Sequence, residues 1–561
     1  MQTPPTQLVA SRRPLPGLLL LLAMACLPAL PQTAPSASTH TSEPATGSYR
    51  IAGTVVNAVS GEPVRRATVA VLAEEDSHTV ASVESDSEGR FSLERLPAAK
   101  YQLTASKRGF RSAFYDEHDE FSAAIVTGPG QETGSLTFRL VPGAVLHGVV
   151  AADGGDPVEG ATVMLFLKPS GRRQAKRITQ VDSVTTDDTG AYEFSNLAAG
   201  EYLVAVTAEP WYALHRSASR PRQNPGDSGA ALDLAFPVTF FDSTTEDSSA
   251  TRIVLAGGSR EEANINLHAV PALHLVVETP RKPDGSIVRP ELRQTVFGTV
   301  VSTESAGFLD SIQSGTTEFT GVAPGRYELA QGDPPRIVDL DATTSQQVDP
   351  SLGTPTVTVT GTLRNPSGSA LPYEATVTLN WLDGPHRQEP VRTVSRNGWF
   401  SFGSAASSEW GLSAEAGVNG KPLVIVSTTV GSRTRLGNLV TVRDRPLSVV
   451  VTVSEVATRI EGFARRDGEG VAGVMVVLAP KDLTTIQGLV RRDQSDSDGS
   501  FALRDVVPGQ YTVVAIEDGW NLDWEQPGVI GRYLPRGIAV TVTDRSGKLV
   551  PLSEPVPVQT R

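Results

Sequence analysis

The sequence predicts an all-β chain, built as a tandem array of about five antiparallel β-sandwich domains. The first observation behind this prediction is a pattern that recurs five times. In each copy a turn glycine precedes a short strand, and an aromatic residue follows ten positions after that strand's first core position. The copies run from Gly89 to Tyr101, Gly190 to Tyr202, Gly315 to Tyr327, Gly398 to Trp410 and Gly499 to Tyr511. A fixed internal period indicates an array of one small module.

The second observation is the character of the segments inside each copy. Phe91 and Leu93 alternate with polar neighbours, as do Val69 and Val71, and this period of two indicates strands with one buried face. Turns recur every 8 to 12 residues, and sustained helical periodicity is almost absent. Short strands with such regular turns are typical of antiparallel sandwiches.

The elements of the first copy illustrate the order expected in all of them. An apolar strand over residues 51–56 leads through a turn at 60–64 to a second strand at 67–71. The turn at 86–89 reads Asp-Ser-Glu-Gly, in which Asp accepts hydrogen bonds from the turn backbone and Gly takes a positive φ. We therefore expect the corner aromatics to be structural core residues. They are Tyr101, Tyr202, Tyr327, Trp410 and Tyr511.

The spacing of the opening strands gives the domain boundaries. Gly53 lies 48 residues before Tyr101, and the corresponding distances in the other copies range from 49 to 54 residues. We therefore expect sandwiches one to five at residues 48–142, 143–270, 271–353, 354–455 and 456–561, the third being degenerate.

The first 47 residues have a different composition. Arg12 and Arg13 precede an apolar stretch centred on residues 18–22, which predicts an export signal over residues 1–34. A retained membrane anchor is the alternative. Residues 35–47, rich in Ser, Thr, Pro and Ala, are expected to be a disordered linker. Cys26 is the single cysteine, and it could carry a lipid if cleavage occurs just before it.

The composition limits which partners the protein could bind and where it is located. The chain has 561 residues and a formal charge of −13, which disfavours nucleic-acid binding because that requires a basic surface. A mature chain without thiols has no disulfides, so each module must be stabilised by burial of its own core. We expect a protein that is secreted or held in the cell envelope, with polysaccharide or envelope protein as its partner, and with a membrane contact only through the lipid.

The repeated residues resemble the carboxypeptidase regulatory-like domain family. That family has a transthyretin-like (prealbumin-like) sandwich of seven strands, with an opening Gly-x-Val, a Gly-x-Pro turn, Asp-x-x-Gly-x-Phe and Pro-Gly-x-Tyr. Sandwiches one, two and five match well, whereas the fourth keeps only the spacing and the third keeps Pro324-Gly-Arg-Tyr327. The resemblance implies a non-catalytic accessory module of exported bacterial proteins, in a fold group that includes carbohydrate-binding modules.

Three motifs could carry chemistry, but each is better explained by local structure. His40 and Glu43 have zinc-ligand spacing in a linker that offers no scaffold or third ligand. Residues 226–229 read Gly-Asp-Ser-Gly as in serine proteases, without the other members of a triad. Asp496 and Asp498 partly match a calcium loop, and the sequence leaves open whether calcium binds that turn. We therefore predict no catalytic residues, metal or cofactor.

Aromatic residues in the inserts after the corner positions suggest a binding site. The rings expected to stack on sugars are Trp520, Trp524 and Tyr533 in sandwich five, and Trp211 and Tyr212 in sandwich two. Loops at one end of a sandwich are where binding residues gather. The alternative is that these rings close the core. The prediction is a non-catalytic exported array that binds carbohydrate at the cell surface, and the alternative is a structural spacer or protein-interaction array.

Overall fold

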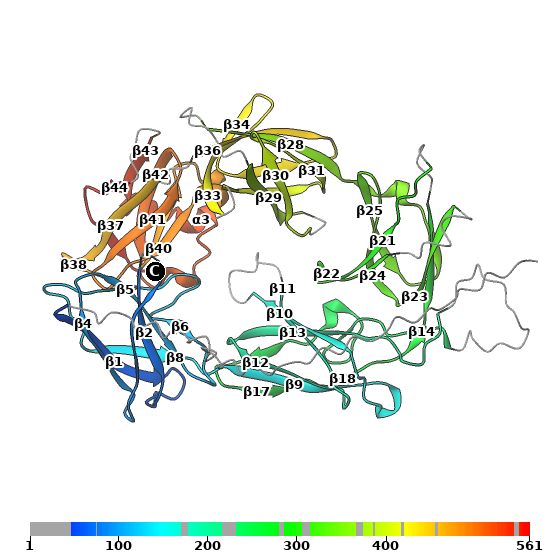
Figure 1. Ribbon diagram of the computed structural model, residues 1–561, viewed down its shortest axis with the longest axis horizontal. Coiled ribbons are helices and arrows are strands. Elements are labelled where there is room, and N and C mark those ends of the chain that lie inside the picture. Colours follow the sequence, from blue (N-terminus) through cyan, green and yellow to red (C-terminus); the bar gives the residue numbers. More distant parts are fainter. Residues whose placement is uncertain are drawn as a thin grey trace, which may run out of the picture. The chain divides into compact units, whose positions relative to one another are not determined.

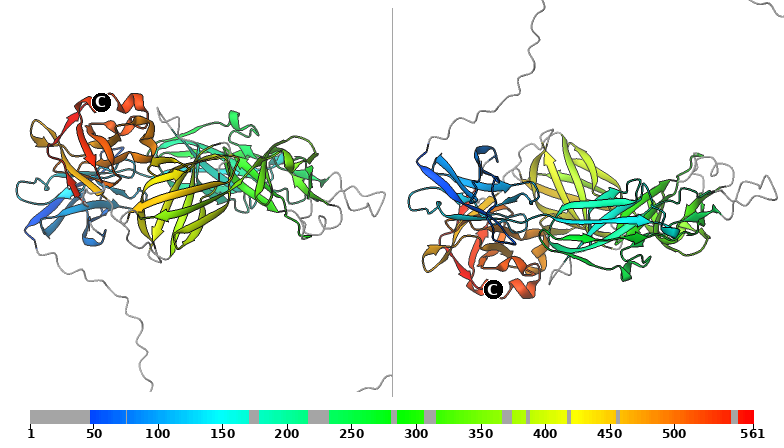
Figure 2. Two further views of the ribbon diagram at one scale, coloured as in Figure 1. Left: turned by 90° about the horizontal axis from the view of Figure 1, so that it is seen from above. Right: turned by 90° about the horizontal axis from the view of Figure 1, so that it is seen from below.

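The computed structural model describes residues 47–561, apart from residue 75 and segments 170–177, 216–231, 280–284, 306–314, 366–373, 385–387, 417–419, 455–457 and 544–548. Strands make up nearly all of its regular structure (Figures 1 and 2). In this part of the chain, α-helix is confined to the four-residue segments α2 (Ile486–Leu489) and α3 (Pro527–Ile530), besides short 3-10 turns. The all-β prediction is confirmed.

Sandwich one shows the plan that the other copies vary. One sheet has the order β4-β1-β8 and the other β3-β2-β5-β6, with β7 also paired to β5. The strands are β1 (Tyr49–Asn57), β2 (Thr68–Ala73), β3 (Thr79–Glu84), β4 (Arg90–Leu96), β5 (Lys100–Ser106), β6 (Ala113–Phe114), β7 (Ile125–Val126) and β8 (Leu136–Leu140). Alternate residues of these strands, such as Val69 and Val71, meet in one buried cluster between the sheets.

Sandwich two repeats this plan with additional short strands. Its sheets are β12-β9-β17, with β18 on β9, and β11-β10-β13-β15, with β16 on β13; β14 pairs β19. The strands are β9 (Ala144–Ala151), β10 (Thr162–Lys168), β11 (Thr179–Thr185), β12 (Ala191–Leu197), β13 (Gly200–Thr207), β14 (Leu234–Ala235), β15 (Thr239–Phe240), β16 (Ile253–Leu255), β17 (Arg260–Glu262), β18 (Ile265–Asn266) and β19 (Val270–Pro271).

Sandwich three has the same two-sheet arrangement although its sequence matches the repeat pattern only in part. Its sheets are β23-β20-β26 and β22-β21-β24-β25-β27. The strands are β20 (Leu273–Glu278), β21 (Glu291–Val296), β22 (Thr299–Ser305), β23 (Thr316–Val322), β24 (Gly325–Gly332), β25 (Pro335–Ala342), β26 (Gln346–Val348) and β27 (Thr354–Pro355). Its core cluster is smaller than those of its neighbours and includes Leu275, Phe319 and Tyr327.

In sandwich four the two sheets are joined by hydrogen bonds into one strand order. The strand order is β34-β33-β36-β28-β31-β30-β29-β32-β35, and β32 also pairs β33, which closes the described strands into a cycle. The strands are β28 (Val357–Arg364), β29 (Glu374–Asp383), β30 (Val391–Arg396), β31 (Trp399–Ala405), β32 (Ser408–Ala416), β33 (Lys421–Val430), β34 (Arg433–Leu436), β35 (Leu439–Val442) and β36 (Leu447–Ser454). The tight turn at Asn397 and Gly398 makes β30 and β31 a hairpin that links the sheets.

Sandwich five has the order β38-β37-β45-β42-β39-β40, with β41 and β44 on β37 and β43 on β42. The strands are β37 (Thr458–Arg466), β38 (Glu469–Gly470), β39 (Met475–Pro480), β40 (Arg491–Gln494), β41 (Ser500–Val506), β42 (Gly509–Ile516), β43 (Ile538–Val542), β44 (Leu549–Pro551) and β45 (Val556–Gln559).

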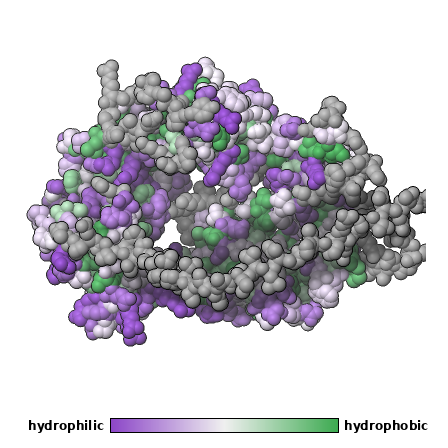
Figure 3. Space-filling model, viewed as in Figure 1, coloured by the Kyte–Doolittle hydropathy of each residue, from purple (hydrophilic) through white to green (hydrophobic). Residues whose placement is uncertain are grey.

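On the face drawn in Figure 3, apolar side chains lie in small patches among hydrophilic ones.

The opening strand of every copy also pairs in parallel, with one strand in sandwiches one, three and four and with two short strands in sandwiches two and five, which the antiparallel prediction did not include. β1 pairs β4 antiparallel and β8 parallel, and the same holds for the equivalent strands of the other sandwiches. A strand that returns to the first sheet after crossing from the second can run parallel to the opening strand. The opening glycine fits this close pairing, because a Cβ on Gly148 would lie only 2.2 Å from the carbonyl oxygen of Ala263.

The five corner aromatics share one geometry. Each is at most 6% exposed, and each donates a hydrogen bond to the carbonyl oxygen four residues before it. The donor–acceptor distances are 3.2 Å for Tyr101, 3.0 Å for Tyr202, 2.8 Å for Tyr327, 3.0 Å for Trp410 and 2.8 Å for Tyr511. The ring therefore fills the core while its polar atom holds the incoming loop, which explains why Trp can replace Tyr here.

Several sequence predictions lie outside the described residues. These are the export signal with Cys26, residues 35–46 of the linker including His40 and Glu43, and the Gly-Asp-Ser-Gly segment at 226–229.

Candidate functional site

The aromatic pair of sandwich five is buried, which corrects the expectation that it forms a sugar-stacking platform. Trp520 and Trp524 are only 7% and 9% exposed, and Tyr533 is partly buried against the same cluster. The indole Nε1 of Trp520 donates a hydrogen bond to the carbonyl oxygen of Gly473 at 3.1 Å. In this arrangement neither indole face is available to a sugar.

The reason is the strand that lies beneath these rings. All six residues of β39 are buried, with Val476 and Leu478 in the core between the sheets and Met475 and Val477 on the outer face. A strand that is apolar on both faces needs a cover on each side. The insert over residues 519–537 supplies the outer cover. The continuous apolar run at 474–479 is the sequence signal that would have predicted this burial.

The aromatic pair of sandwich two is arranged differently. Trp211 is 92% exposed, and its ring meets that of the partly buried Tyr212 edge to face, with 5.6 Å between ring centroids. Leu214, at 46% exposure, follows in the same loop. A fully presented indole beside a second ring is the type of surface that stacks on apolar faces of ligands.

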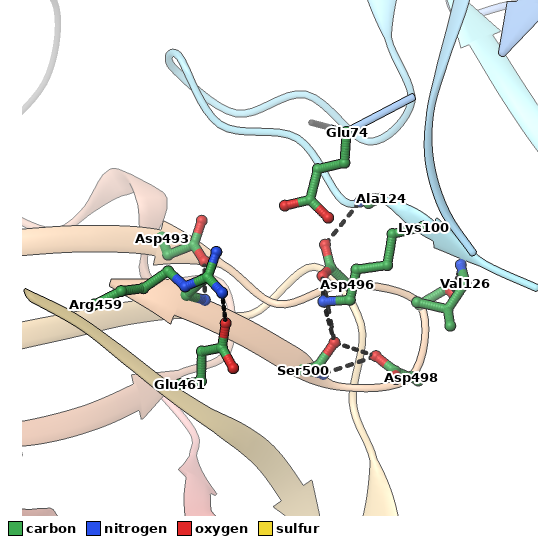
Figure 4. Close-up of polar contacts among 12 residues, drawn as sticks. Glu74, Lys100, Ala124, Val126, Arg459, Glu461, Asp493, Asp496, Asp498 and Ser500 are labelled. Atoms are coloured by element: carbon green, nitrogen blue, oxygen red, sulfur yellow. Dashed lines mark hydrogen bonds and ion pairs between the residues drawn. The ribbon is translucent and has the colours of Figure 1, made fainter. Parts of the chain in front are cut away.

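The turn that partly matches a calcium loop contacts an ammonium group. Lys100 of β5 in sandwich one places its Nζ 2.6 Å from Oδ2 of Asp496 and donates to Oγ of Ser500 at 2.8 Å (Figure 4). The other oxygen, Oδ1 of Asp496, accepts from the backbone N–H of Ala124 at 2.9 Å. Asp498 accepts from Ser500 in its own turn. The lysine takes the charge-neutralising role a cation would have.

A comparison of the repeats shows that the carboxylate of Asp496 has different hydrogen-bond partners from its equivalents. In sandwiches one and two the equivalent Asp86 and Asp187 accept backbone hydrogen bonds of their own turns, from Arg90 at 2.8 Å and Ala191 at 2.9 Å. Asp496 keeps the turn's backbone bonds but directs its carboxylate to sandwich one. The same sequence motif therefore serves turn formation in two copies and a contact between copies in the third.

Burial determines the electrostatics of this contact. Burial raises the pKa of Asp496, although the Lys100 ammonium opposes the shift. For Lys100, burial works to lower the pKa, but the Asp496 carboxylate outweighs it and the pKa is raised. Nearby in sandwich five, burial raises the pKa of Asp493 to about 7, while its carboxylate accepts a hydrogen bond from the N–H of Ala502 at 2.6 Å.

A second group of titratable residues connects sandwiches two and three. Asp233 lies between two histidines, 2.9 Å from Nδ1 of His215 and 2.7 Å from Nε2 of His274. His274 also lies 2.8 Å from Glu318. Burial tends to lower the pKa of His274, but Asp233 and Glu318 together raise it. Each ring nitrogen of His274 thus contacts a carboxylate. This series of residues therefore forms a structural contact between the two sandwiches.

Nothing in the described residues resembles a metal centre or a membrane helix. They contain no group of three or more His, Cys, Asp or Glu side chains placed to hold a metal ion. No helix among them has the length and apolar character needed to cross a membrane.

Solved structures similar to this chain include a pilin and part of a collagen-binding protein. The TIE protein of Bacillus anthracis is 12% identical, with 69% of this chain and 68% of that chain covered and a TM-score of 0.16. Two B repeat units of the collagen-binding protein of Staphylococcus aureus are 12% identical, with 72% and 100% covered and a TM-score of 0.12. The minor pilin GBS52 of Streptococcus agalactiae is 12% identical, with 42% and 99% covered and a TM-score of 0.21. These values are too low to bear on function.

Among curated proteins, none matches this chain. Models of protein families do match. The carboxypeptidase regulatory-like domain matches residues 50–141 and 145–222, and the second β-sandwich domain of BOS complex subunit NOMO1-like proteins matches residues 457–530. The resemblance inferred from the sequence is therefore confirmed: the carboxypeptidase regulatory-like model matches two tandem segments, in sandwiches one and two, and the NOMO1-like model matches a segment of sandwich five.

Proposed function

We propose that this chain is a non-catalytic, exported array of sandwiches that acts as an adhesin-like binding and spacing protein of the cell envelope. Support comes from the tandem cores, each buried between its own sheets, and from the family matches, since the carboxypeptidase regulatory-like domain is a non-catalytic accessory module.

Carbohydrate is the proposed ligand, and Trp211 with Tyr212 is its proposed contact. The observation that carries this is the 92% exposure of Trp211, which the fold does not require. Exposing a large apolar ring to water is unfavourable, so a ring held in the open beside a second ring is best explained by a ligand. Trp520 and Trp524 are left out of this site because they are almost fully buried, and Tyr533 is partly buried against the same cluster.

The test is retention of residues 48–561 on immobilised polysaccharides, comparing the wild type with Trp211→Ala. Trp399→Ala is the matched control, because Trp399 is also an exposed tryptophan, at 57%, on sandwich four. Loss of retention in Trp211→Ala alone would support the site. Equal retention of all three proteins would exclude a role for Trp211.

A protein-interaction array is the second candidate. The observation that favours it is the contact between sandwiches one and five, in which charged, aromatic and backbone groups of one sandwich meet partners on the other. Such matching is typical of a specific protein interface.

A further inference from the structure

The connection between sandwiches two and three is short and is held by backbone hydrogen bonds. β19 ends at Pro271 and β20 begins at Leu273, so a single residue, Ala272, separates the two strands. The N–H of Ala272 donates to the carbonyl oxygen of Asp233 at 2.9 Å, and β14, which begins directly after Asp233, pairs β19. Asp233 of sandwich two is therefore fixed beside the point where the chain enters sandwich three.

The imidazole of His274, on β20, contacts a carboxylate through each ring nitrogen. Its Nε2 lies 2.7 Å from Oδ2 of Asp233 in sandwich two, and its Nδ1 lies 2.8 Å from Oε1 of Glu318 on β23 in sandwich three. An ionised carboxylate only accepts hydrogen bonds, and a neutral imidazole has only one N–H. Bonds to two ionised carboxylates therefore form together only when the ring is protonated, so this contact between the sandwiches requires a charged histidine.

The three side chains of this contact are largely shielded from water. The exposed fractions are 21% for His274, 20% for Asp233 and 8% for Glu318. Hydrogen bonds between charged groups are stronger in such surroundings than in open solvent. If the ring loses its proton, one nitrogen presents a lone pair to a carboxylate, and a largely buried negative charge loses its partner. Deprotonation of His274 therefore converts an attractive contact into a repulsive one.

The second histidine of the group, His215, holds Asp233 from the other side. Its Nδ1 lies 2.9 Å from Oδ1 of Asp233, and its ring lies so close to β23 that a Cβ on Gly321 would be 2.5 Å from its Cδ2. Acidic groups also face His215, because Glu209 lies 3.6 Å from its Nε2 and Glu304 of β22 interacts with both through its charge. The junction thus gathers carboxylates from both sandwiches around two imidazoles.

The pKa of His274 gives the direction of the pH dependence. Burial tends to lower this pKa, but the carboxylates of Asp233 and Glu318 raise it above its ordinary value of 6.5. A histidine whose pKa is raised by folding stabilises the contact fully below pH 6.5, and this stabilisation is lost as the pH rises through the raised pKa. Burial tends to raise the pKa of Asp233, but its hydrogen bonds with His215 and His274 lower it, so Asp233 stays ionised over the same range.

Another contact between the same two sandwiches carries no charge. Phe297, in the turn between β21 and β22, lies against Phe166 and Phe240 of sandwich two, with ring centroids 5.1 and 5.2 Å apart. Burial of apolar rings does not depend on protonation. We therefore expect this apolar contact to hold the sandwiches together whatever the charge of His274.

We propose that the junction between sandwiches two and three is a pH-sensitive hinge. While His274 is protonated, it bridges Asp233 to Glu318 and holds the strand connection closed. Loss of that proton releases the connection, and the apolar contact at Phe297 then acts as the pivot. The array is therefore stiffer at this point in mild acid and more flexible in mild alkali. The proposal does not depend on the ligand of Trp211.

The test is hydrogen exchange of residues 48–561 at pH 6 and pH 9, corrected for the intrinsic effect of pH on the exchange rate. Peptides covering residues 270–276 report the N–H of Ala272. We expect their protection to fall by about tenfold or more from pH 6 to pH 9, which is the ratio expected for the loss of one hydrogen bond to a charged group. Peptides from β24, in the core of sandwich three, should stay protected at both pH values, which shows that the sandwich remains folded.

Three variants separate the proton on His274 from other effects of pH. His274→Gln is uncharged at both pH values, so its junction peptides should be weakly protected at both. His274→Arg keeps a positive charge, so its junction peptides should stay protected at pH 9. His268→Gln is the matched control, because it removes an exposed histidine paired with Asp153 and should keep the wild-type pH dependence.

Equal protection of the wild-type junction at the two pH values would overturn the proposal, as would a fall of the same size in His274→Gln. Titration of the His274 imidazole by NMR in the wild type provides a measurement that requires no variant to fold. Its midpoint should lie above pH 6.5 and coincide with the midpoint of the change in exchange at Ala272. A midpoint below pH 6.5, or one distinct from that of the exchange, would refute the hinge.

Discussion

Replacing Tyr202 with alanine should unfold sandwich two while sandwich five stays folded. The ring is 3% exposed and packs with Val163, Phe194 and Ile253 in the core of that sandwich. Removing a buried ring of this size costs about 3–5 kcal/mol. Its hydroxyl also donates to the carbonyl oxygen of Ala198 at 3.0 Å, and the loss of that bond adds about 1 kcal/mol. Since whole domains are stable by only about 5–15 kcal/mol, the sum removes much of the stability of one sandwich.

The assay is hydrogen exchange of residues 48–561 resolved by peptide, comparing Tyr202→Ala, Tyr202→Phe and the wild type. Peptides from β10 and β13 should lose protection in Tyr202→Ala, whereas those from β42, which carries Tyr511, should not change. Tyr202→Phe keeps the ring and loses only the hydrogen bond, so it should lower stability by about 1 kcal/mol. Unchanged protection of β10 and β13 in Tyr202→Ala would refute the structural role assigned to the corner aromatics.

Two further predictions concern a carboxylate and a glycine. The pKa of Asp493 is raised from 3.8 in the unfolded chain to about 7 in the folded protein. The stability contributed by its protonated carboxyl group is therefore fully present below pH 3.8 and is lost as the pH rises through 7. Because Asn is neutral at every pH and can still accept the hydrogen bond from Ala502, we expect Asp493→Asn to stabilise sandwich five by on the order of 2 kcal/mol at pH 8 and by little at pH 4. Equal effects in thermal melts at both pH values would contradict this. Gly148→Ala places a Cβ 2.2 Å from the carbonyl oxygen of Ala263, so it should separate β9 from its parallel neighbours. We expect this substitution to destabilise sandwich two by about 1–3 kcal/mol, measured by urea unfolding. An unchanged urea midpoint would show that the strands can move apart freely.

The turns and the corner positions can be predicted from the repeat, because both depend on local physics. Gly89, Gly190 and Gly499 have φ values of 74°, 74° and 82°, which a glycine reaches without strain and which the Asp-x-x-Gly pattern predicts. Alternation of apolar residues likewise predicts which face of a strand is buried, since successive side chains point to opposite sides.

The candidate site depended on tertiary structure. Trp520 looks like an exposed loop residue until the apolar outer face of β39 and the insert that covers it are seen together. Asp496 has the same sequence context as Asp86, yet its partner is Lys100, 396 residues away along the chain. Sequence patterns report a residue's neighbours along the chain. The partners that decide burial, charge and binding are set by which surfaces of separate sandwiches meet, and that is determined only when the chain is folded.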